Sequence, residues 1–252
     1  MIKLLLNGCN GKMGQVISRL VSEDDSLTIV AGFDINTEQK NDYPVYDSPD
    51  KYDGNADVLI DFSHPSSLEG VLNYCTKNRI PAVIATTGLS NVQKNEILAA
   101  SEKTPLFFSA NMSLGINLLI NLAKKAAVLL EDNFDIEIIE RHHNQKIDAP
   151  SGTALAIADG ISEALSYEPQ YTYDRHSVRK KRGKTEIGLH ALRGGTIVGD
   201  HTVVFAGNDE VIELHHSAAS KEVFAVGAVK AAKFLSGKAP GLYDMNALIS
   251  EL

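Results

Sequence analysis

The fold is decided close to the N-terminus, by the stretch Lys3-Leu4-Leu5-Leu6-Asn7-Gly8-Cys9-Asn10-Gly11-Lys12-Met13-Gly14. Its apolar first part, Lys3–Asn7, predicts a β-strand, and Met13–Glu23 predicts an amphipathic helix. Glycines between a strand and a helix permit a tight turn, and they let backbone N–H groups at the helix N-terminus approach a pyrophosphate. The spacing is G-x-x-G-x-x-G instead of the commoner G-x-G-x-x-G, so the stretch indicates a dinucleotide site only through its strand–turn–helix context.

Asp34 is the acidic partner that such a site needs. It follows the predicted strand Leu27–Phe33, twenty residues beyond Gly14, where a carboxylate accepts hydrogen bonds from the adenosine ribose. The alternative is that Asp34 serves only as a turn residue at the end of a strand. Ile35 comes next, so no arginine is placed beside Asp34 for a 2′-phosphate, and a carboxylate repels a phosphate. We therefore expect NADH to be preferred over NADPH as the cofactor.

The first half of the chain alternates short apolar runs with helical stretches. Further strands are predicted at Val58–Phe62, Ala82–Ala85 and Leu106–Ser109, with helices from Pro65 to Asn78 and at Asn91–Lys103. Strands that alternate with helices form a parallel sheet covered on both faces. We therefore expect an α/β fold with a Rossmann-like parallel-sheet cofactor domain over residues 1–113, rejoined by residues 221–252.

Three loops follow strands of this sheet at their carboxyl ends, where open α/β sheets bind ligands. They are Asp61-Phe62-Ser63-His64-Pro65, Ala85-Thr86-Thr87-Gly88 and Ser109-Ala110-Asn111-Met112. Their small and hydroxyl-bearing residues suit close packing against a nicotinamide and its ribose. Any one of these loops, taken alone, is equally well explained by ordinary turn chemistry.

The sequence pattern changes near residue 113. Leu114–Leu130 and Thr153–Ala164 predict helices, and strand-like runs occur at Phe134–Glu140, Ile187–Leu192, His201–Ala206 and Glu210–His216. Glycine-rich turns separate the last three runs, which is typical of antiparallel strands. We expect a mixed α/β substrate domain over residues 114–220 with a largely antiparallel sheet. A helix from Ser220 to about Leu235 then returns to the first domain.

The chemistry is concentrated in the fifteen residues from Glu140 to Ala154, Glu-Arg-His-His-Asn-Gln-Lys-Ile-Asp-Ala-Pro-Ser-Gly-Thr-Ala. Backbone N–H groups at the helix start Ser151-Gly152-Thr153 bind a carboxylate well. Lys146 supplies a cation or a proton, and His142 or His143 supplies a general acid, a role for which histidine is the usual residue type. Hydride reduction of a C=C or C=N bond needs this combination, because a proton must reach the atom beside the one that receives hydride.

Two other interpretations of this stretch stay open. The paired histidines, with His215 and His216, are potential metal ligands, but no acidic or cysteine partner stands at ligand spacing, and we predict no metal. The second alternative is a capped helix with a surface lysine and no chemistry.

Composition narrows the class of protein further. A net charge of −8 over 252 residues argues against a nucleic-acid binder. No segment reaches the ~20 apolar residues of a membrane span, and the N-terminus lacks a signal-peptide cleavage site. The two cysteines, Cys9 and Cys75, have no metal spacing and indicate a reducing compartment, so we expect a cytoplasmic protein. The basic run 179–184 is expected to be a solvated loop.

Taken together, these motifs resemble one family, 4-hydroxy-tetrahydrodipicolinate reductase, also called dihydrodipicolinate reductase. The resemblance rests on the glycine turn, Asp61-Phe62-Ser63, Ala85-Thr86-Thr87-Gly88, Ser109-Ala110-Asn111-Met112-Ser113, the His142-to-Thr153 stretch, Leu192-Arg193-Gly194-Gly195 and Gly241-Leu242-Tyr243-Asp244-Met245, in that order. It covers essentially the whole chain. Its most specific part is Lys-x-Asp-Ala-Pro-Ser-Gly-Thr, which begins at Lys146.

The resemblance implies NAD(P)H-dependent reduction of a small dicarboxylate on the path to diaminopimelate and lysine, with loss of water. It implies that His142 is the acid/base residue, that Lys146 is the proton donor, and that His143 with the Gly152-Thr153 backbone holds substrate carboxylates. The cofactor would contact residues 8–13, Asp34, residues 85–87 and residues 109–112. It also implies a homotetramer built through the second domain, which thus serves substrate binding and oligomerisation.

The sequence departs from the family at two places. Some members carry Glu-Arg where this chain has Asp34-Ile35, and some carry an arginine where it has Lys221, which lacks the bidentate fork. Two alternatives to the family function remain at this point. One is another two-domain dehydrogenase, although the phosphorylating kind needs an active-site thiolate. The other is a non-catalytic sensor that binds NAD(H).

Overall fold

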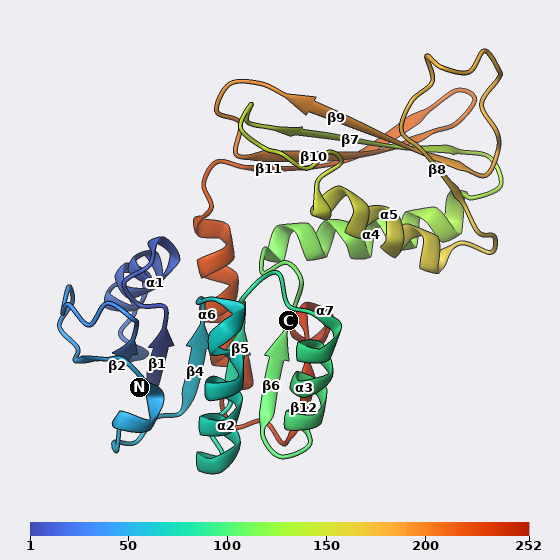
Figure 1. Cartoon of the computed structure of the whole chain (residues 1–252). Coiled ribbons are helices and arrows are strands. Elements are labelled where there is room, and N and C mark those ends of the chain that lie inside the picture. Colours follow the sequence, from blue (N-terminus) through green and yellow to red (C-terminus); the bar gives the residue numbers. More distant parts are fainter. Residues whose placement is uncertain (252) are drawn as a thin grey trace. The chain divides into compact units, whose positions relative to one another are not determined.

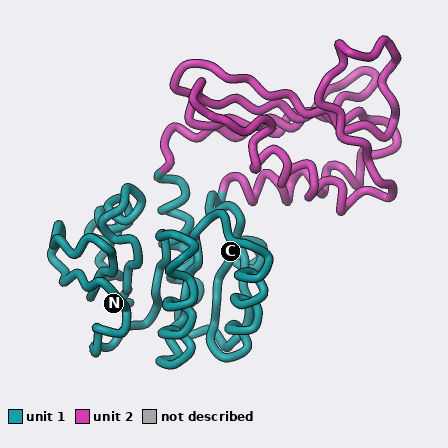
Figure 2. Tube along the Cα trace, in the orientation of Figure 1, with its two compact units in different colours: residues 1–114, 222–252 teal, residues 115–221 magenta. Residues whose placement is uncertain are grey.

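The computed structural model describes residues 1–251, which form two compact units (Figure 2). Unit 1 consists of Met1–Leu114 and the chain from Glu222 onward, and unit 2 of Gly115–Lys221. No helix among residues 1–251 is both long and apolar enough to cross a membrane.

Unit 1 contains a seven-stranded sheet in the order β12-β6-β5-β4-β1-β2-β3, and every neighbouring pair of strands is parallel. Its strands are β1 (Ile2–Asn7), β2 (Leu27–Phe33), β3 (Val45–Tyr46), β4 (Val58–Asp61), β5 (Ala82–Ile84), β6 (Pro105–Phe108) and β12 (Gly241–Tyr243). Its helices are α1 (Lys12–Ser22), α2 (Leu68–Asn78), α3 (Asn91–Ser101), α6 (Glu222–Leu235) and α7 (Met245–Ser250), with short 3₁₀ turns at Pro49–Lys51 and Pro65–Ser67. The predicted parallel α/β architecture is confirmed.

Both faces of this sheet are buried, because successive side chains of a strand point to opposite faces. On β1, Leu4 and Leu6 pack with residues of α1, α6 and α7, whereas Leu5 packs with residues of α2 and α3 (Figure 1). The apolar run in β1 therefore serves two cores, and α6 closes one of them with the alanines Ala225, Ala228, Ala231 and Ala232.

Unit 2 contains a five-stranded sheet in the order β11-β10-β7-β9-β8. The strands are β7 (Asp135–His142), β8 (Gln170–Thr172), β9 (Glu186–Arg193), β10 (Gly199–Ala206) and β11 (Val211–Ala218). Two pairs are antiparallel, β10 with β7 and with β11, and two are parallel, β9 with β7 and with β8. The sheet is mixed instead of largely antiparallel, because β7 lies between β9 and β10 and separates two strands that follow each other in sequence.

Helices α4 (Leu114–Leu130) and α5 (Gly152–Ala164) lie along one face of this sheet (Figure 1). Ile136 and Ile138 of β7 pack there with Leu119 of α4 and Ile157 of α5. Residues two apart on a strand share a face, so the same alternation brings Glu140 and His142, at the end of β7, to the helix-covered side, where both are buried.

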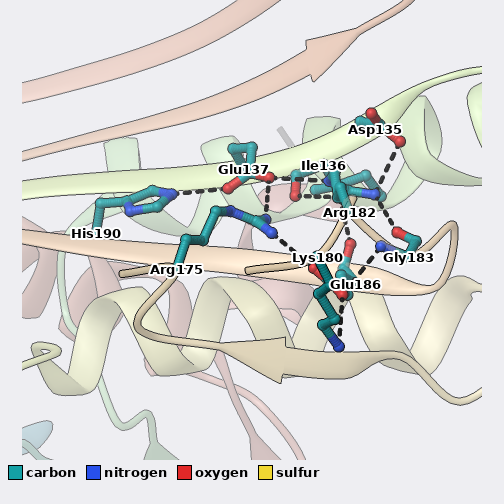
Figure 3. Close-up of polar contacts among 9 residues, drawn as sticks. All are labelled: Asp135, Ile136, Glu137, Arg175, Lys180, Arg182, Gly183, Glu186 and His190. Atoms are coloured by element: carbon teal, nitrogen blue, oxygen red, sulfur yellow. Dashed lines mark hydrogen bonds and ion pairs between the residues drawn. The ribbon is translucent and has the colours of Figure 1, made fainter. Parts of the chain in front are cut away.

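The basic run 179–184 is only partly the solvated loop expected from sequence. Arg179, Lys180 and Lys181 are exposed, but the Arg182 side chain is folded onto β7. It donates to the Asp135 and Glu137 carboxylates and to backbone oxygens nearby (Figure 3). The long segment between β8 and β9 is thereby tied to the sheet.

Candidate active site

The glycine turn of unit 1 has the geometry that its spacing predicts. Gly8 has φ +79°, and a Cβ there would lie 2.4 Å from the Phe62 carbonyl oxygen. A Cβ on Gly14 would lie 2.2 Å from the Gly8 oxygen. Gly11 is the N-cap of α1. The turn thus requires glycine at both ends, and it exposes backbone at the start of α1 in the manner of an anion-binding cradle.

Asp34 lies beside this turn. Its Oδ2 accepts the Asn10 amide N–H at 3.0 Å, and its Oδ1 accepts the Asn36 amide at 3.0 Å. A pocket of about 450 Å³ is lined by both Asp34 and the turn, and its lining also includes Ile35, Phe62, Ser63, Ser67 and Gly70. The lining of the pocket therefore includes an acceptor carboxylate and the adjoining glycine cradle, the two groups that an adenosine ribose and a pyrophosphate require.

Asn10 and Cys9 play different parts in the turn. The Asn10 Nδ2 donates to the Asn36 and Glu38 backbone oxygens, while its Oδ1 is buried and makes no hydrogen bond among residues 1–251. The Cys9 side chain is fully buried, and burial raises the pKa of its thiol to about 11. Burial also raises the pKa of the Cys75 thiol. Neither cysteine therefore supplies the thiolate of a phosphorylating dehydrogenase.

The fully buried Asp61 carboxylate organises two of the predicted loops. It accepts hydrogen bonds from Asn7 Nδ2 at 2.8 Å, Thr86 Oγ1 at 2.7 Å and Ser63 Oγ at 2.5 Å. Burial raises the pKa of Asp61, and these donors oppose that effect. One carboxylate thus joins the ends of β1, β4 and β5, leaving Thr87 exposed beyond buried Ala85 and Thr86.

The third loop, residues 109–112, is held by its own polar groups and by α6. Ser109 Oγ donates to the Asn111 backbone oxygen at 3.0 Å, and Asn111 Oδ1 accepts the Ser113 amide at 2.9 Å. A Cβ on Gly227 of α6 would lie 1.7 Å from the Met112 oxygen, so α6 approaches this loop backbone to backbone. Met112 is buried and Ala110 is exposed.

In unit 2, His142 lies at the end of β7 and is anchored through one ring nitrogen. Its Nδ1 lies 2.7 Å from Glu140 Oε2, and its ring meets the His201 ring edge-on with centroids 5.2 Å apart. Glu140 is fully buried. Burial alone would raise the pKa of Glu140, but hydrogen bonds from Arg193, His142 and the Ser151 amide outweigh it, so the pKa lies below the usual value.

Helix α5 begins at Gly152, directly after Ser151. Ser151 caps the helix, its Oγ accepting the Ala154 amide at 3.1 Å. The same Oγ lies 3.1 Å from His201 Nε2. Burial lowers the pKa of His201 to about 4, so this ring is neutral at physiological pH. Gly152 is exposed and has open space where a Cβ would be. Its backbone N–H contacts the Asp148 carboxylate, so this helix start already faces an anionic oxygen.

Lys146 and His143 belong to the turn between β7 and α5. Lys146 Nζ lies 2.9 Å from Asp148 Oδ1, and the Lys146 amide donates to the His143 oxygen at 3.2 Å. The Asp148 backbone oxygen accepts from Arg193 Nη2 at 2.6 Å. A chain of contacts therefore connects Lys146, Arg193 and the His142 anchor within unit 2. Among residues 1–251, no group of three His, Cys, Asp or Glu side chains is arranged to hold a metal ion.

Three residues of this cluster had no role assigned from the sequence: Glu140, Arg193 and His201, although Glu140 and Arg193 lie within the motifs quoted above. Glu140 carried a usable signal, because a residue two before His142 on a strand must share its face. Arg193 and His201 are 53 and 61 residues from Glu140 along the chain, and no local pattern links them to it.

Unit 1 has the features of a dinucleotide-binding domain, and unit 2 carries an anchored histidine, a lysine and an exposed helix start. These features are those of a nicotinamide-dependent reductase of an anionic substrate. The family model of the N-terminus of dihydrodipicolinate reductase matches residues 2–112, and that of its C-terminus matches residues 115–249. The chain belongs to the dihydrodipicolinate reductase family, which confirms the resemblance seen in the sequence.

Relatives of known name agree with this membership. The chain is 52% identical over 251 residues to 4-hydroxy-tetrahydrodipicolinate reductase of Caldanaerobacter subterraneus subsp. tengcongensis, covering 100% of this chain and 99% of that protein. The enzyme of the same name from Clostridium novyi is 48% identical, with 99% and 98% covered. The dipicolinate-bound dihydrodipicolinate reductase from Paenisporosarcina sp. TG-14 has a TM-score of 0.83 at 25% identity and covers 98% of this chain and 99% of its own.

Proposed function

We propose that this chain reduces 4-hydroxy-tetrahydrodipicolinate to tetrahydrodipicolinate with hydride from NAD(P)H and loss of water, in diaminopimelate and lysine biosynthesis. Family membership over residues 2–112 and 115–249 supports the reaction. The observation that carries the chemistry is the anchoring of His142 Nδ1 on Glu140 beside the Ser151-capped start of α5. A histidine held in this way has its second nitrogen available for proton transfer.

Each predicted residue of unit 2 has a role in this proposal. His142 acts as acid/base residue and Lys146 as proton donor, so that a proton reaches the ring atom beside the one reduced. The N–H groups of Gly152 and Thr153, at the positive end of α5, bind a substrate carboxylate together with His143. Ser151 holds the helix start in place through its cap. Asp148, paired with Lys146 at 2.9 Å, keeps that ammonium group in the turn.

The residues of unit 1 fit a dinucleotide. The cradle has no room for a Cβ at Gly8 or Gly14, the adjoining pocket holds Asp34, and the buried Asn10 Oδ1 has no partner among the described residues. A bound dihydronicotinamide cofactor supplies the hydride. The residues proposed to hold it are Gly8, Cys9, Asn10, Gly11, Lys12, Met13, Asp34, Ala85, Thr86, Thr87, Ser109, Ala110, Asn111 and Met112. Cys9, Ala85, Thr86 and Met112 are buried, so they act through their backbone.

We further propose that NADH is the preferred cofactor. Asp34 presents a carboxylate where a 2′-phosphate would lie, and Ile35, fully exposed, offers no compensating charge. Ile35→Arg should therefore raise kcat/KM with NADPH and leave kcat/KM with NADH nearly unchanged. Wild-type kinetics with both cofactors in competition test the preference directly, and a large advantage of NADPH would overturn it.

The reaction is tested by generating the unstable substrate in situ from pyruvate and aspartate semialdehyde with a synthase, and following oxidation of NADH and NADPH. Oxidation that depends on the complete mixture supports the proposal, and none with either cofactor refutes it. Lys146→Ala should lose turnover by roughly 10²-fold or more while binding NADH normally. Lys181→Ala, which removes an exposed lysine of the same unit, is the matched control and should keep full turnover.

We also propose that the chain assembles as a homotetramer through the uncovered face of the unit 2 sheet. Helices α4 and α5 cover one face only (Figure 1). On the other face, Leu192 of β9 is 50% exposed and Val211 of β11 is 59% exposed, and apolar side chains of this size at an uncovered sheet face favour association. Leu192→Glu should lower the molar mass in solution, measured by light scattering. A wild-type protein that is monomeric at micromolar concentration would contradict the proposal.

A further inference from the structure

The Glu140 carboxylate is the buried centre of a hydrogen-bond network in unit 2. It is fully buried and receives four donors. Oε2 accepts from His142 Nδ1 and from Arg193 Nη1, both at 2.7 Å. Oε1 accepts from Arg193 Nη2 at 2.7 Å and from the Ser151 amide at 3.0 Å. Each oxygen therefore has one contact with the arginine and one with a different part of the proposed site.

The two oxygens of Glu140 therefore hold two different parts of the proposed site. Through Oε2 the carboxylate holds the proposed proton-transfer residue, and through Oε1 it holds the N-cap residue of the helix whose start is proposed to bind a substrate carboxylate. Arg193 extends the network, because its Nη2 also donates to the Asp148 backbone oxygen at 2.6 Å. The Asp148 carboxylate in turn pairs with Lys146. One buried ion pair thus fixes the proton site, the anion site and the lysine turn relative to one another.

The chemistry of the carboxylate dictates the state of the histidine. An ionised carboxylate only accepts hydrogen bonds, and the bidentate arginine keeps Glu140 ionised despite its burial. His142 Nδ1 must then carry the proton that is shared with Oε2. In the neutral ring this leaves the lone pair on Nε2, and in the protonated ring it leaves the transferable proton there.

The neighbouring His201 ring fits the same arrangement. It packs edge-on against His142, and its Nε2 contacts the Ser151 hydroxyl. Because burial keeps His201 neutral, with a pKa of about 4, its ring adds no second positive charge beside a protonated His142.

We propose that Glu140 is the positioning residue of this active site: clamped by Arg193, it fixes His142 as the Nδ1–H tautomer with Nε2 as the reacting nitrogen, and it holds the start of α5 in register with that nitrogen. The inference rests on the proposed reductase function and deepens it. Glu140 acts through His142 and Ser151 and does not itself touch the substrate.

Glu140→Gln tests the role with nearly the same side-chain shape. The amide has one acceptor oxygen and one NH₂ donor, so it cannot accept from both His142 Nδ1 and the Ser151 amide. An NH₂ that faces His142 needs an acceptor at Nδ1, and the ring must then take the Nε2–H tautomer. Loss of the correct tautomer in the Ser-His-Asp triad costs about 10⁴-fold, and we expect kcat to fall by roughly 10²–10⁴-fold with a rise in substrate KM. The Kd for NADH should not change. Glu137→Gln, on the opposite face of the same strand, is the matched control and should keep its kcat.

Nitrogen NMR of protein labelled with ¹⁵N-histidine reports the tautomer independently of turnover, and His142→Asn identifies the signal. Wild-type His142 should be the Nδ1–H tautomer, and Glu140→Gln should populate the Nε2–H form. If Glu140→Gln does not fold, Arg193→Lys keeps the charge but loses the fork, and should lower kcat by a smaller factor. An Nε2–H tautomer in the wild type, or full kcat in Glu140→Gln, overturns the inference. A wild type without turnover would instead refute the proposed function, while the NMR result still decides the tautomer.

Discussion

Strand β7 carries two clusters built from the same residue types on its two opposite faces. On the helix-covered face, Glu140 binds His142 and Arg193. On the other face, Glu137 binds His190 Nε2 at 2.7 Å and Arg182 Nε at 3.0 Å (Figure 3). The first cluster uses Nδ1 of its histidine and the second uses Nε2, so opposite ring nitrogens are left available.

The two clusters differ most in burial and in what else their arginines hold. The Glu140 side chain is 1% exposed and that of Glu137 21%. Arg193 joins a carboxylate to the turn that carries Lys146, whereas Arg182 joins β7 to the segment before β9 through Asp135 and three backbone oxygens. We infer that the inner cluster orients chemistry and the outer one fastens a loop. Residue types alone do not distinguish the two.

The largest expected difference between the two clusters comes from replacing the histidine of each one in turn. His142→Asn should lower kcat/KM by roughly 10²–10⁴-fold, the usual contribution of a general acid or base, while the Kd for NADH stays the same. His190→Asn should leave kcat/KM at the wild-type level, because its ring contacts Glu137 on the face of β7 opposite His142. The measurement is steady-state kinetics on in situ substrate. Equal losses in both variants would show that the two clusters are not functionally different.

Replacing the arginine of the outer cluster should lower the stability of the fold and leave turnover unchanged. Arg182→Gln removes a guanidinium that donates to two carboxylates and three backbone oxygens and is only 17% exposed. Hydrogen bonds to charged groups contribute about 1.5–3 kcal/mol, and we expect the free energy of unfolding in urea to fall by roughly 2 kcal/mol. The variant should keep its kcat and its molar mass. A large loss of kcat at unchanged stability would assign the outer cluster a role in the reaction.

Ser151 caps α5 and also belongs to the inner cluster, and a smaller predicted effect distinguishes these two roles. Ser151→Ala removes the cap of α5 and the contact with His201, and caps contribute about 1 kcal/mol. We expect that loss of stability together with a raised substrate KM. Ser90→Ala removes the cap of α3 in unit 1 and should cost a similar amount of stability without any change in KM. A KM that responds equally to both variants would contradict the proposed anion site.

The sequence predicted the parts of this structure that depend on local patterns. The glycine turn, Asp34 and the longer strands of unit 1 follow from spacing and apolar runs, and His142, Lys146 and Ser151 lie within one turn and helix start. Strands β3 and β12, of two and three residues, are too short for any periodicity to predict.

The order of strands in unit 2 could not be predicted, because it depends on distant partners. Ile138 of β7 pairs with Leu189 on one side and Val203 on the other, and this inserts β7 between two strands that are consecutive in sequence. The same long-range pairing brings Arg193 and His201 to Glu140. The clamp on His142 is thus a product of sheet order, and it became visible only with the fold.

The smallest predicted effect concerns acid, and it tests whether the segment before β9 is held through the ionised carboxylate of Glu186. Glu186, which accepts from Arg175 Nη1 at 2.7 Å and from the Gly183 amide at 3.0 Å, has its pKa lowered from 4.5 to about 2 by the Arg175 hydrogen bond first and the Gly183 amide next. A lowered pKa in the folded state stabilises the fold above the unfolded-state value, and this contribution is lost as the pH falls through the folded-state value. Glu186→Gln should therefore be less stable than the wild type at neutral pH, and the difference should shrink from about pH 4.5 and vanish near pH 2. Urea unfolding across this range measures it, with the exposed Glu168→Gln as control. A difference that does not change with pH would mean that packing, and not charge, holds the segment before β9 at Glu186.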